Sequence, residues 1–352
     1  MGNAFAGTVA GSRMTSVKEF RVEEPATPER LGRGSFVFTD DYSVFDWGKM
    51  PDAIPNKGAS LCAMGAHNFE LLEAEGVPTH YRGVVSGGDV RELDRVGSPP
   101  REMAIDLTRV PDLPHEGRDY DYDAFHEAAG ENYLVPLEIV FRNRVPVGSS
   151  LRSRATPEEV GLDRDDWPDE PVDLPGPVVE FSTKFEESDR YLSRGEADRI
   201  AGRADLDELE DRARTANRVI TGRAAEAGLT HQDGKIECLY YRGEVRVADV
   251  VGTFDENRFA YDGQQVSKEV LRQYHKRTQP EWIEAVSAAK DRAEAEDVAD
   301  WRTPCEAEPE PLSGQVIDAM RDLYAGGANA YVGRELFDAP DLAAAVERVR
   351  GL

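Results

Sequence analysis

Hydrophobic and polar residues alternate over two short stretches near the start of the chain. The stretches 16–22 and 34–40 show the two-residue period of a half-buried β-strand. A helix is predicted after the Pro- and Gly-containing loop 54–60, because apolar residues recur at helical spacing from Met64 until Gly76. This portion therefore predicts a small β-rich unit closed by a helix.

The strongest strand pattern of the chain lies in its middle. Apolar and β-branched residues run from 133 to 141 and lead into the basic turn 142–150, and another strand-like run begins at 178. The preceding stretch, about 86–131, is rich in Gly, Pro and Asp, has little periodicity and includes an expected loop at 117–123. We therefore predict an irregular insertion at 86–131.

Helical periodicity dominates two later stretches. A long helix is predicted over 196–227, where apolar residues fall on one face and indicate core packing. The stretch 267–274 is typical of a capped helix start and places Lys268 and Arg272 four residues apart, on one face.

The length and these patterns predict more than one structural unit. The expected segments are a flexible N-terminal extension (1–13), an N-terminal nucleotide-binding domain with its insertion (14–132), a central catalytic domain (133–300), and an acidic linker with C-terminal helices around 316–323 and 342–349 (301–352).

A predicted β-hairpin spans the runs 235–241 and 244–251, with Arg242-Gly243 as its turn. Glu237 and Asp249 then lie on paired strands and can point into one space. Magnesium prefers hard oxygen ligands and keeps waters or phosphates, so two such carboxylates can hold it beside a nucleotide. Lys235 shares the face of Glu237, as a polyphosphate site requires. The alternative is a solvated hairpin face of mixed charge.

Composition limits the classes of partner. The formal net charge is −26 over 352 residues, with 68 acidic against 42 basic residues spread along the chain. Nucleic-acid binding needs clustered positive charge and is not expected. A distributed acidic surface is typical of a protein kept soluble in concentrated salt, where charges are screened.

Cysteine usage and hydropathy bear on the compartment. Three cysteines show no metal-ligand spacing and no pairing pattern, which favours a reducing cytoplasm. No apolar run approaches the roughly 20 residues of a membrane span, and no signal-peptide core precedes the first strand.

Lysine is scarce among the basic residues. Eight of the 42 are Lys, so those that remain are candidates for sites that require a compact ammonium, such as phosphate binding. Lys57 beside Gly58 is one candidate, with a polar helix cap as the alternative. Arg142 and Arg144 end the strand 133–141 before Gly148-Ser149, which suits an anion pocket as well as a basic surface turn.

Taken in order, these motifs resemble those of the phosphoribosylaminoimidazole-succinocarboxamide synthase (SAICAR synthetase) family. The resemblance covers most of 14–333 and rests on Lys18, Ser43-Val44-Phe45-Asp46, Ile54-Pro55-Asn56-Lys57-Gly58, Pro136-Leu137-Glu138 through Arg142 with Gly148-Ser149, Ser182-Thr183-Lys184, Asp233-Gly234-Lys235-Ile236-Glu237, Asp249 with Asp255 and Arg258, and Ser267-Lys268-Glu269-Val270-Leu271-Arg272.

The resemblance implies an α+β fold in which a small β-rich N-terminal domain and a larger domain of antiparallel sheet and helices enclose an ATP cleft. It implies a ligase that uses ATP and Mg²⁺ to join L-aspartate to carboxyaminoimidazole ribonucleotide through an acyl phosphate, in de novo purine biosynthesis. The expected partners are these small molecules, with no nucleic acid and no membrane; a homo-oligomer stays open.

The resemblance also implies roles for single residues. The metal ligands are Glu237 and Asp249; ATP meets Lys18, Lys235 and the hinge Pro136, Leu137 and Glu138; substrate meets Arg142, Ser149, Arg258, Lys268 and Arg272; and the catalytic groups are Lys57, Lys184, Lys235 and Arg258.

The chain departs from the family pattern at two motifs. Thr15-Ser16-Val17-Lys18 stands where the family has Arg-Gly-Lys, and Asp189-Arg190-Tyr191 stands where it has His-Asp. An apparent one-residue insertion leaves Arg142 and Arg144 both open as the anion ligand. Two alternative functions are another ATP-dependent ligase or small-molecule kinase of the same fold, and a nucleotide-binding protein without turnover.

Overall fold

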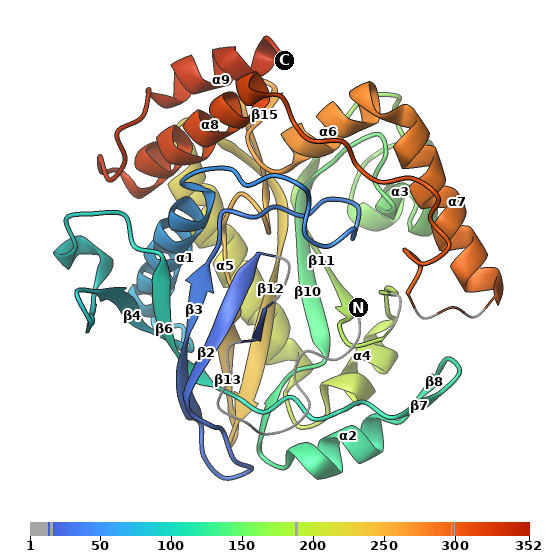
Figure 1. Ribbon diagram of the computed structural model, residues 1–352. Coiled ribbons are helices and arrows are strands. Elements are labelled where there is room, and N and C mark those ends of the chain that lie inside the picture. The colour runs from blue at the N-terminus through green and yellow to red at the C-terminus, as the bar shows by residue number, and fades with distance from the viewer. Residues whose placement is uncertain (1–12, 15–16, 187–188, 297, 299) are drawn as a thin grey trace.

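Two antiparallel β-sheets form the centre of the molecule, and helices cover them (Figure 1). The computed structural model describes residues 13–14, 17–186, 189–296, 298 and 300–352. Most of the expected N-terminal extension, residues 1–12, lies outside the described residues.

The N-terminal sheet has six strands in the order β1-β2-β3-β6-β4-β5. Its strands are β1 (Arg13–Met14), β2 (Lys18–Glu24), β3 (Gly32–Phe38), β4 (Tyr81–Ser86), β5 (Asp89–Arg91) and β6 (Glu102–Leu107). The strands predicted at 16–22 and 34–40 correspond to β2 and β3. The helix expected before Gly76 is α1 (Lys57–Ala74), which packs on this sheet with Met64 fully buried.

The stretch 86–131 is not the irregular insertion that its composition predicted. It supplies β6, which pairs with β3 on one side and β4 on the other and so lies inside the sheet. It also contains a 3-10 turn, a small hairpin and a helix where the loop 117–123 was expected: η1 (Leu93–Arg95), β7 (His115–Glu116), β8 (Asp119–Tyr120) and α2 (Tyr122–Ala129). Gly and Pro at the element ends masked the short alternation within β6.

The central sheet has seven strands, with β12 as its spine. The path is β11-β10-β12-β14-β15, and β13 and β9 also pair with β12. Its strands are β9 (Asn132–Leu134), β10 (Leu137–Val145), β11 (Val172–Thr183), β12 (Thr230–Tyr241), β13 (Glu244–Ala248), β14 (Arg258–Tyr261) and β15 (Gln264–Gln265). The single strand expected over 133–141 is two strands, because Pro136 has no N–H to continue the ladder.

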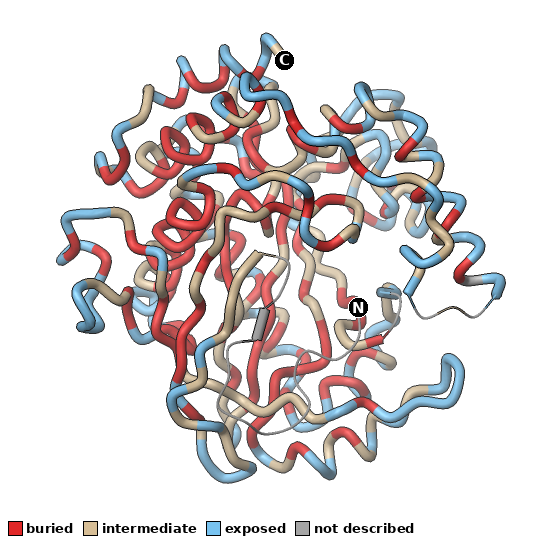
Figure 2. Tube along the Cα trace, in the orientation of Figure 1, coloured by how far each residue is buried: buried red, intermediate tan, exposed pale blue. Residues whose placement is uncertain are grey.

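The helix predicted over 196–227 is also two elements. Helix α4 (Arg194–Ala201) stops at Gly202, whose φ of 70° is left-handed, and α5 (Leu206–Glu226) starts again with the Asp205 side chain as its N-cap. The apolar face of α5 packs on β10, β11 and β12, which buries one face of the central sheet. Strands β10 and β12 are largely red in the burial view, whereas α5 alternates between buried and exposed residues (Figure 2).

The later helices lie along the top and the right side of the molecule in the orientation of Figure 1. They are α3 (Leu151–Arg154), which follows β10, and α6 (Glu269–Thr278), α7 (Pro280–Glu296), α8 (Gly314–Val332) and α9 (Leu342–Arg350); a second 3-10 turn is η2 (Glu158–Val160). The predicted helix at 316–323 is much longer than expected, since α8 packs on α1 along its length. Within the described part of the chain, no helix has the length and apolar character to span a bilayer.

Hydrogen bonds join the two sheets directly. The backbone N–H of His80 donates to the carbonyl of Val247 at 3.0 Å, and the N–H of Val247 donates to the carbonyl of Pro78 at 2.9 Å. The start of β4 is thus fixed to β13, and β2 is held beside the end of β13. The predicted domain boundaries stay a prediction.

Candidate functional site

The open face of the central sheet carries charged side chains at alternate positions. On β12 these are Asp233, Lys235 and Glu237, while Ile236 between them is buried on the α5 side. The register places Val140 opposite Lys235 and Arg142 opposite Asp233. The alternation therefore builds two adjoining charged regions, one around Lys235 and Glu237 and one around Asp233.

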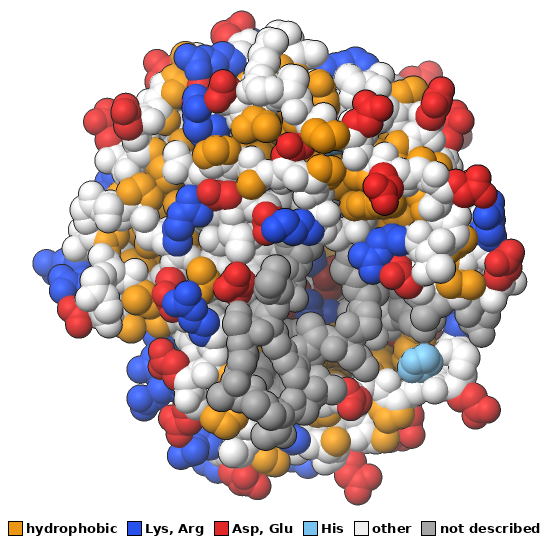
Figure 3. Space-filling model, in the orientation of Figure 1, with side chains coloured by type: hydrophobic (Ala, Val, Ile, Leu, Met, Phe, Trp, Pro, Cys, Tyr) orange, Lys and Arg blue, Asp and Glu red, His pale blue; other side chains and the backbone are white. Residues whose placement is uncertain are grey.

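The first region, here called the lysine end, contains three ammonium groups and four carboxylates. Its members are Lys18, Lys184, Lys235, Glu138, Glu237, Asp249 and Glu256. Lys18 pairs with Asp249, Lys184 with Glu237 and Lys235 with Glu138. The Nζ of Lys235 also lies 3.8 Å from Glu237 and 3.7 Å from Glu256. Figure 3 shows a hollow in the molecule over this part of the sheet, with charged side chains at its bottom.

Asp249 reaches the lysine end from a turn and not from a strand. β13 ends at Ala248, which is the residue opposite Glu237, so the prediction that Asp249 lies on a paired strand is wrong. Its φ of 61° is left-handed, a conformation that Asp tolerates better than most residues. The ring of His80 donates from Nε2 to the Asp249 carbonyl at 3.1 Å. Nε2 is the donor because a carbonyl oxygen can only accept. The hydrogen bond fixes the backbone of the turn at Asp249.

Burial and charge set the protonation of the two predicted metal ligands. Burial raises the pKa of Glu237 to about 7, although the ammonium of Lys184 opposes it. Burial also tends to raise the pKa of Asp249, but the ammonium groups of Lys18 and Lys184 hold it below the usual range. For Lys235, burial lowers the pKa, and the carboxylates of Glu256 and Glu138 more than reverse this. Lys235 therefore stays charged at neutral pH.

The carboxylates of the lysine end fit a magnesium ion whose remaining ligands are waters and phosphate oxygens. Across the described residues, no group of three His, Cys, Asp or Glu side chains converges as a complete metal cage. Two neighbouring carboxylates, Glu237 and Asp249, are nonetheless present in a region where carboxylates outnumber ammonium groups. Mg²⁺ is typically bound through one or two carboxylates plus waters and substrate phosphates, so the residues present fit this ion.

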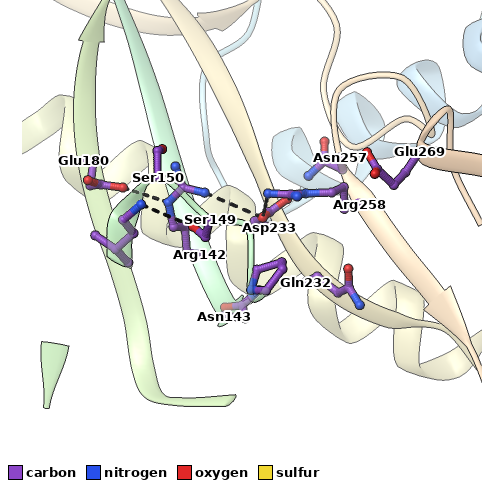
Figure 4. A network of polar contacts seen from close by, with 12 residues as sticks. Arg142, Asn143, Ser149, Ser150, Glu180, Gln232, Asp233, Asn257, Arg258 and Glu269 are labelled. Atoms are coloured by element: carbon purple, nitrogen blue, oxygen red, sulfur yellow. Dashed lines mark hydrogen bonds and ion pairs between the residues drawn. The ribbon is translucent and has the colours of Figure 1, made fainter. Parts of the chain in front are cut away.

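The second region, here called the arginine end, is centred on Asp233 (Figure 4). The Nε of Arg258 donates to Asp233 at 2.7 Å, and a terminal nitrogen of the same guanidinium contacts the other carboxylate oxygen. Arg142 lies on the opposite side of Asp233, at 3.7 Å, and donates from Nε to Glu180 at 2.7 Å. Both guanidinium groups are thus held in fixed planes by carboxylates.

The arginine end includes two further residues that were not predicted to be part of the site. Arg154 pairs with Glu180, and its guanidinium lies 3.4 Å from the ring centroid of Tyr191. The Tyr191 hydroxyl accepts a hydrogen bond of 2.7 Å from Arg142. Arg144 pairs with Asp173 at 2.9 Å and lies outside this network. Only Arg142 of the two open candidates is therefore part of the charged face.

The structure does not bring Lys57 to the lysine end. Its side chain is fully buried, and its ammonium binds Asp255 at 2.6 Å. The nearby Lys268 is itself largely enclosed; burial lowers its pKa, against the opposing effects of Glu256 and Asp255. Arg272 lies 3.4 Å from Glu269 on α6. Lys268 and Arg272 therefore border the loop that precedes β14.

The remaining predicted residues line the edges of the face. The carbonyl of Pro136 accepts from the N–H of Lys184 at 3.3 Å, and Leu137 is fully buried at the start of β10. Ser149 lies in the turn after β10, where its hydroxyl accepts from the N–H of Leu151 at 3.3 Å. Figure 4 places Ser149 beside Arg142.

Sequence reasoning missed His80, Arg154, Glu256 and Tyr191 as parts of the site. Glu256 had a usable signal, since it lies between Asp255 and Arg258, which the family motif includes. Tyr191 lies in Asp189-Arg190-Tyr191, which departs from the family motif, but that departure did not indicate its contact with Arg142. His80 had no signal, because its contact with Asp249 depends on the packing of segments distant in sequence.

The chain is similar in sequence to proteins of one enzyme family. The SAICAR synthetase family model matches residues 27–289. A putative phosphoribosylaminoimidazole-succinocarboxamide synthase from Archaeoglobus fulgidus is 42% identical over 346 residues, covering 96% of this chain and 99% of the relative. The phosphoribosylaminoimidazole-succinocarboxamide synthase of Thermoplasma volcanium is 32% identical over 256 residues, covering 68% of this chain and 77% of the relative.

Solved structures have the same fold at low sequence identity. A SAICAR synthase from Saccharomyces cerevisiae complexed with SAICAR aligns with a TM-score of 0.57 and 17% identity, covering 95% of this chain and 98% of that one. A SAICAR synthetase in complex with ADP aligns with a TM-score of 0.52 and 21% identity, covering 86% of this chain and all of that one.

Proposed function

The chain belongs to the SAICAR synthetase family, and from this premise we propose that the lysine end binds ATP and the arginine end binds carboxyaminoimidazole ribonucleotide. The protein is an ATP-dependent carbon–nitrogen ligase that gives SAICAR, ADP and phosphate in de novo purine biosynthesis. The observation that carries the residue assignment is the alternation along β12, which aligns Asp233, Lys235 and Glu237 on one face.

The lysine end has the composition of a polyphosphate site. Lys18 from β2 and Lys235 from β12 supply ammonium groups from opposite sides, and both are held by carboxylates until a ligand competes for them. Glu237 and Asp249 would hold Mg²⁺, which would neutralise phosphate charge. The segment Pro136-Leu137-Glu138 borders this region and would face the adenine as a hinge.

The arginine end suits the phosphate and carboxylate of the ribonucleotide. Arg142 and Arg258 present planar guanidinium groups whose orientation Asp233 and Glu180 already fix. Guanidinium forks bind phosphate and carboxylate with two parallel hydrogen bonds. Ser149 can add a hydroxyl at the same edge.

The two regions adjoin, as the chemistry requires. A carboxylate oxygen of the ribonucleotide attacks the γ-phosphorus of ATP, the bond to the β–γ bridging oxygen breaks, and ADP leaves. The aspartate amine then attacks the acyl carbon, the bond to the phosphate oxygen breaks, phosphate leaves and the amine loses a proton. Lys184 and Lys235 would stabilise the charge on the transferred phosphoryl group.

Aspartate requires cations of its own. In the described chain, no carboxylate lies within ion-pair distance of the Lys268 ammonium, whereas Lys18, Lys184 and Lys235 are all paired. Lys268 is therefore the cation available at this border for a substrate carboxylate, and Arg272, which is paired with Glu269, would add a second positive charge beside it. Lys57 would act through Asp255 and not on substrate.

Composition supports a proposal about the salt conditions and the compartment in which the protein works. The net charge of −26 supports a protein adapted to concentrated salt, and the free cysteines support a cytoplasmic location. A homo-oligomer stays a prediction.

Product formation in molar potassium chloride tests the function and the metal pair together. With ATP, magnesium, aspartate and carboxyaminoimidazole ribonucleotide, the wild type should form SAICAR and Glu237→Gln should lose on the order of 100-fold or more in kcat. The control is Glu244→Gln, which changes a half-exposed carboxylate on the same hairpin whose ion-pair partner among the described residues is Arg246.

Two outcomes would contradict this assignment. A folded wild type that binds ATP but forms no SAICAR would exclude the ligase. A phosphorylated product that forms without aspartate would favour a kinase of the same fold.

A further inference from the structure

Helix α8 presents two buried tyrosines to the active-site segment 249–258. Tyr324 and Tyr331 are seven residues apart, so both lie on one face of the helix, two turns from each other. Both side chains are almost completely buried, with exposed fractions of 1% and 0%. The Tyr324 hydroxyl donates to a side chain within this segment, and the Tyr331 hydroxyl donates to a side chain that binds its backbone.

Tyr324 fixes the second half of the segment. Its hydroxyl donates to Asp255 at 2.7 Å, and Lys57 donates to the other oxygen of the same carboxylate at 2.6 Å. Asp255 is adjacent to Glu256, which lies 3.7 Å from Lys235, and is three residues from Arg258, which binds Asp233. A carboxylate held from two sides cannot rotate without losing a charged hydrogen bond.

Tyr331 fixes the first half through Asn68. Its hydroxyl donates to the Asn68 side-chain oxygen at 2.8 Å, and the Asn68 amide donates to the carbonyls of Val251 and Gly252 at 3.1 Å each. Gly252 has a left-handed φ of 69°, and a Cβ there would lie 2.3 Å from the Asn68 amide. The backbone two and three residues after Asp249 is thus shaped to receive this amide.

Close packing joins the two contacts. A Cβ at Gly327 would lie 2.6 Å from the ring of Phe254, so the helix backbone approaches the segment where only glycine leaves room. Phe254 also packs against Tyr324, with ring centroids 6.1 Å apart. The helix therefore contacts the segment at the hydroxyl of Tyr324, at Phe254, and through Asn68.

We propose that α8 is a clamp that positions the catalytic segment 249–258, with Tyr324 and Tyr331 as positioning residues. The clamp lies outside the residues 27–289 that the family model matches. The proposal rests on the proposed function, since it assigns the positioned groups, Asp249 and Arg258, to metal and ribonucleotide. Tyr331 acts on the Asp249 side, and Tyr324 acts on the Arg258 side.

Removing single hydroxyl groups tests the clamp. Tyr324→Phe and Tyr331→Phe keep the packed rings and remove only the hydrogen bonds. The control is Tyr133→Phe, another fully buried tyrosine, whose hydroxyl binds the backbone between α4 and α5. All three variants should lose thermal stability, so stability alone does not distinguish a clamp from ordinary packing.

Two measurements separate the roles. In the ligand-free proteins, hydrogen exchange of amides within 249–258 should rise on the order of tenfold in both clamp variants and stay at the wild-type rate in Tyr133→Phe. In turnover, Tyr331→Phe should raise the Mg²⁺ concentration for half-maximal rate on the order of tenfold. Tyr324→Phe should raise KM for the ribonucleotide by a similar factor. KM for aspartate should stay within about twofold in both.

Unchanged exchange across 249–258 in both variants would overturn the clamp. Faster exchange with unaltered kinetics would overturn its positioning role. A wild type that makes no SAICAR would refute the proposed function, while the exchange data would still decide whether α8 holds the segment.

Discussion

The lysine end and the arginine end share one sheet face but hold their cations differently. At the lysine end, Lys18, Lys184 and Lys235 each bind a different carboxylate through a single nitrogen. At the arginine end, one carboxylate, Asp233, lies between two guanidinium groups, and Arg258 contacts both of its oxygens.

This difference matches two kinds of ligand. Ammonium groups on flexible stems can follow a phosphoryl group as it moves between donor and acceptor, and they need not keep one orientation. Guanidinium groups fixed by carboxylates and stacked on a ring are organised before the ligand arrives, which suits a phosphate that takes no part in the reaction. The lysine end should therefore govern the rate, and the arginine end should govern affinity.

Replacing Lys235 by Met should give the largest effect. Lys235 is the only lysine with three carboxylates within 4 Å among the described residues. Its loss removes charge stabilisation from the transferred phosphoryl group, so kcat should fall about 10²–10³-fold with KM for the ribonucleotide nearly unchanged. Steady-state kinetics measure both, with Lys49→Met, an exposed lysine paired with Asp41, as the control. A rise in ribonucleotide KM at constant kcat would reverse the two assignments.

Replacing Arg258 by Lys should affect binding more than rate. The substitution keeps the charge but loses the two-point contact with Asp233 and the fork for the ligand. We expect KM for the ribonucleotide to rise about 10–100-fold while KM for ATP stays within about twofold. The control is Arg218→Lys, which changes an exposed pair with Glu75. An equal rise in both KM values would show that the two ends do not act separately.

The sequence carried enough information to place most of this face, because a strand shows its two-residue period directly. Lys235 and Glu237 were predicted on one side of a strand, and the turn at Arg242-Gly243 was predicted between β12 and β13. The helix expected before Gly76 and the later helix positions also follow from periodicity. The sequence pattern predicts a structural element correctly where residues close in the chain determine its conformation.

Contacts between distant segments could not be predicted in this way. Lys57 and Asp255 are 198 residues apart, and nothing near Lys57 indicates that its ammonium is buried beneath α8. The left-handed turn at Asp249 depends on His80, which comes from the other sheet. The choice between Arg142 and Arg144 depended on burial and ion-pair partners, because both lie on β10.

The two ends are each backed by a buried neutral histidine, which predicts acid sensitivity. Burial lowers the pKa of His231, behind the arginine end, to about 3, and that of His80, behind the lysine end, to about 4. An unfolded histidine titrates near 6.5. Below that pH the two histidines bind a proton in the unfolded chain but stay neutral in the folded chain. The free energy of unfolding therefore falls as pH drops from about 6.5 toward these values.

Each histidine should contribute roughly 1.4 kcal/mol per pH unit to this loss. In His231→Gln, the free energy of unfolding should fall less steeply between pH 6.5 and pH 4 than in the wild type, by about that amount. Denaturant unfolding at several pH values in constant salt measures the slope. Equal slopes would show that His231 takes up its proton at the same pH in the folded and the unfolded chain.

Replacing Arg144 by Gln should have the smallest effect and defines where the arginine end stops. Arg142 and Arg144 lie two residues apart on β10, but the Arg142 side chain is 6% exposed and that of Arg144 is 31% exposed and paired with Asp173. A pair open to solvent contributes about 0–1 kcal/mol, and 1 M salt reduces the screening length to about 3 Å. The loss of unfolding free energy in Arg144→Gln should therefore stay below about 1 kcal/mol in dilute buffer and vanish in molar potassium chloride, with ribonucleotide KM unchanged. A tenfold rise in that KM would instead show that the anion site includes Arg144. The apparent one-residue insertion after Arg142 would then change which arginine binds the ligand.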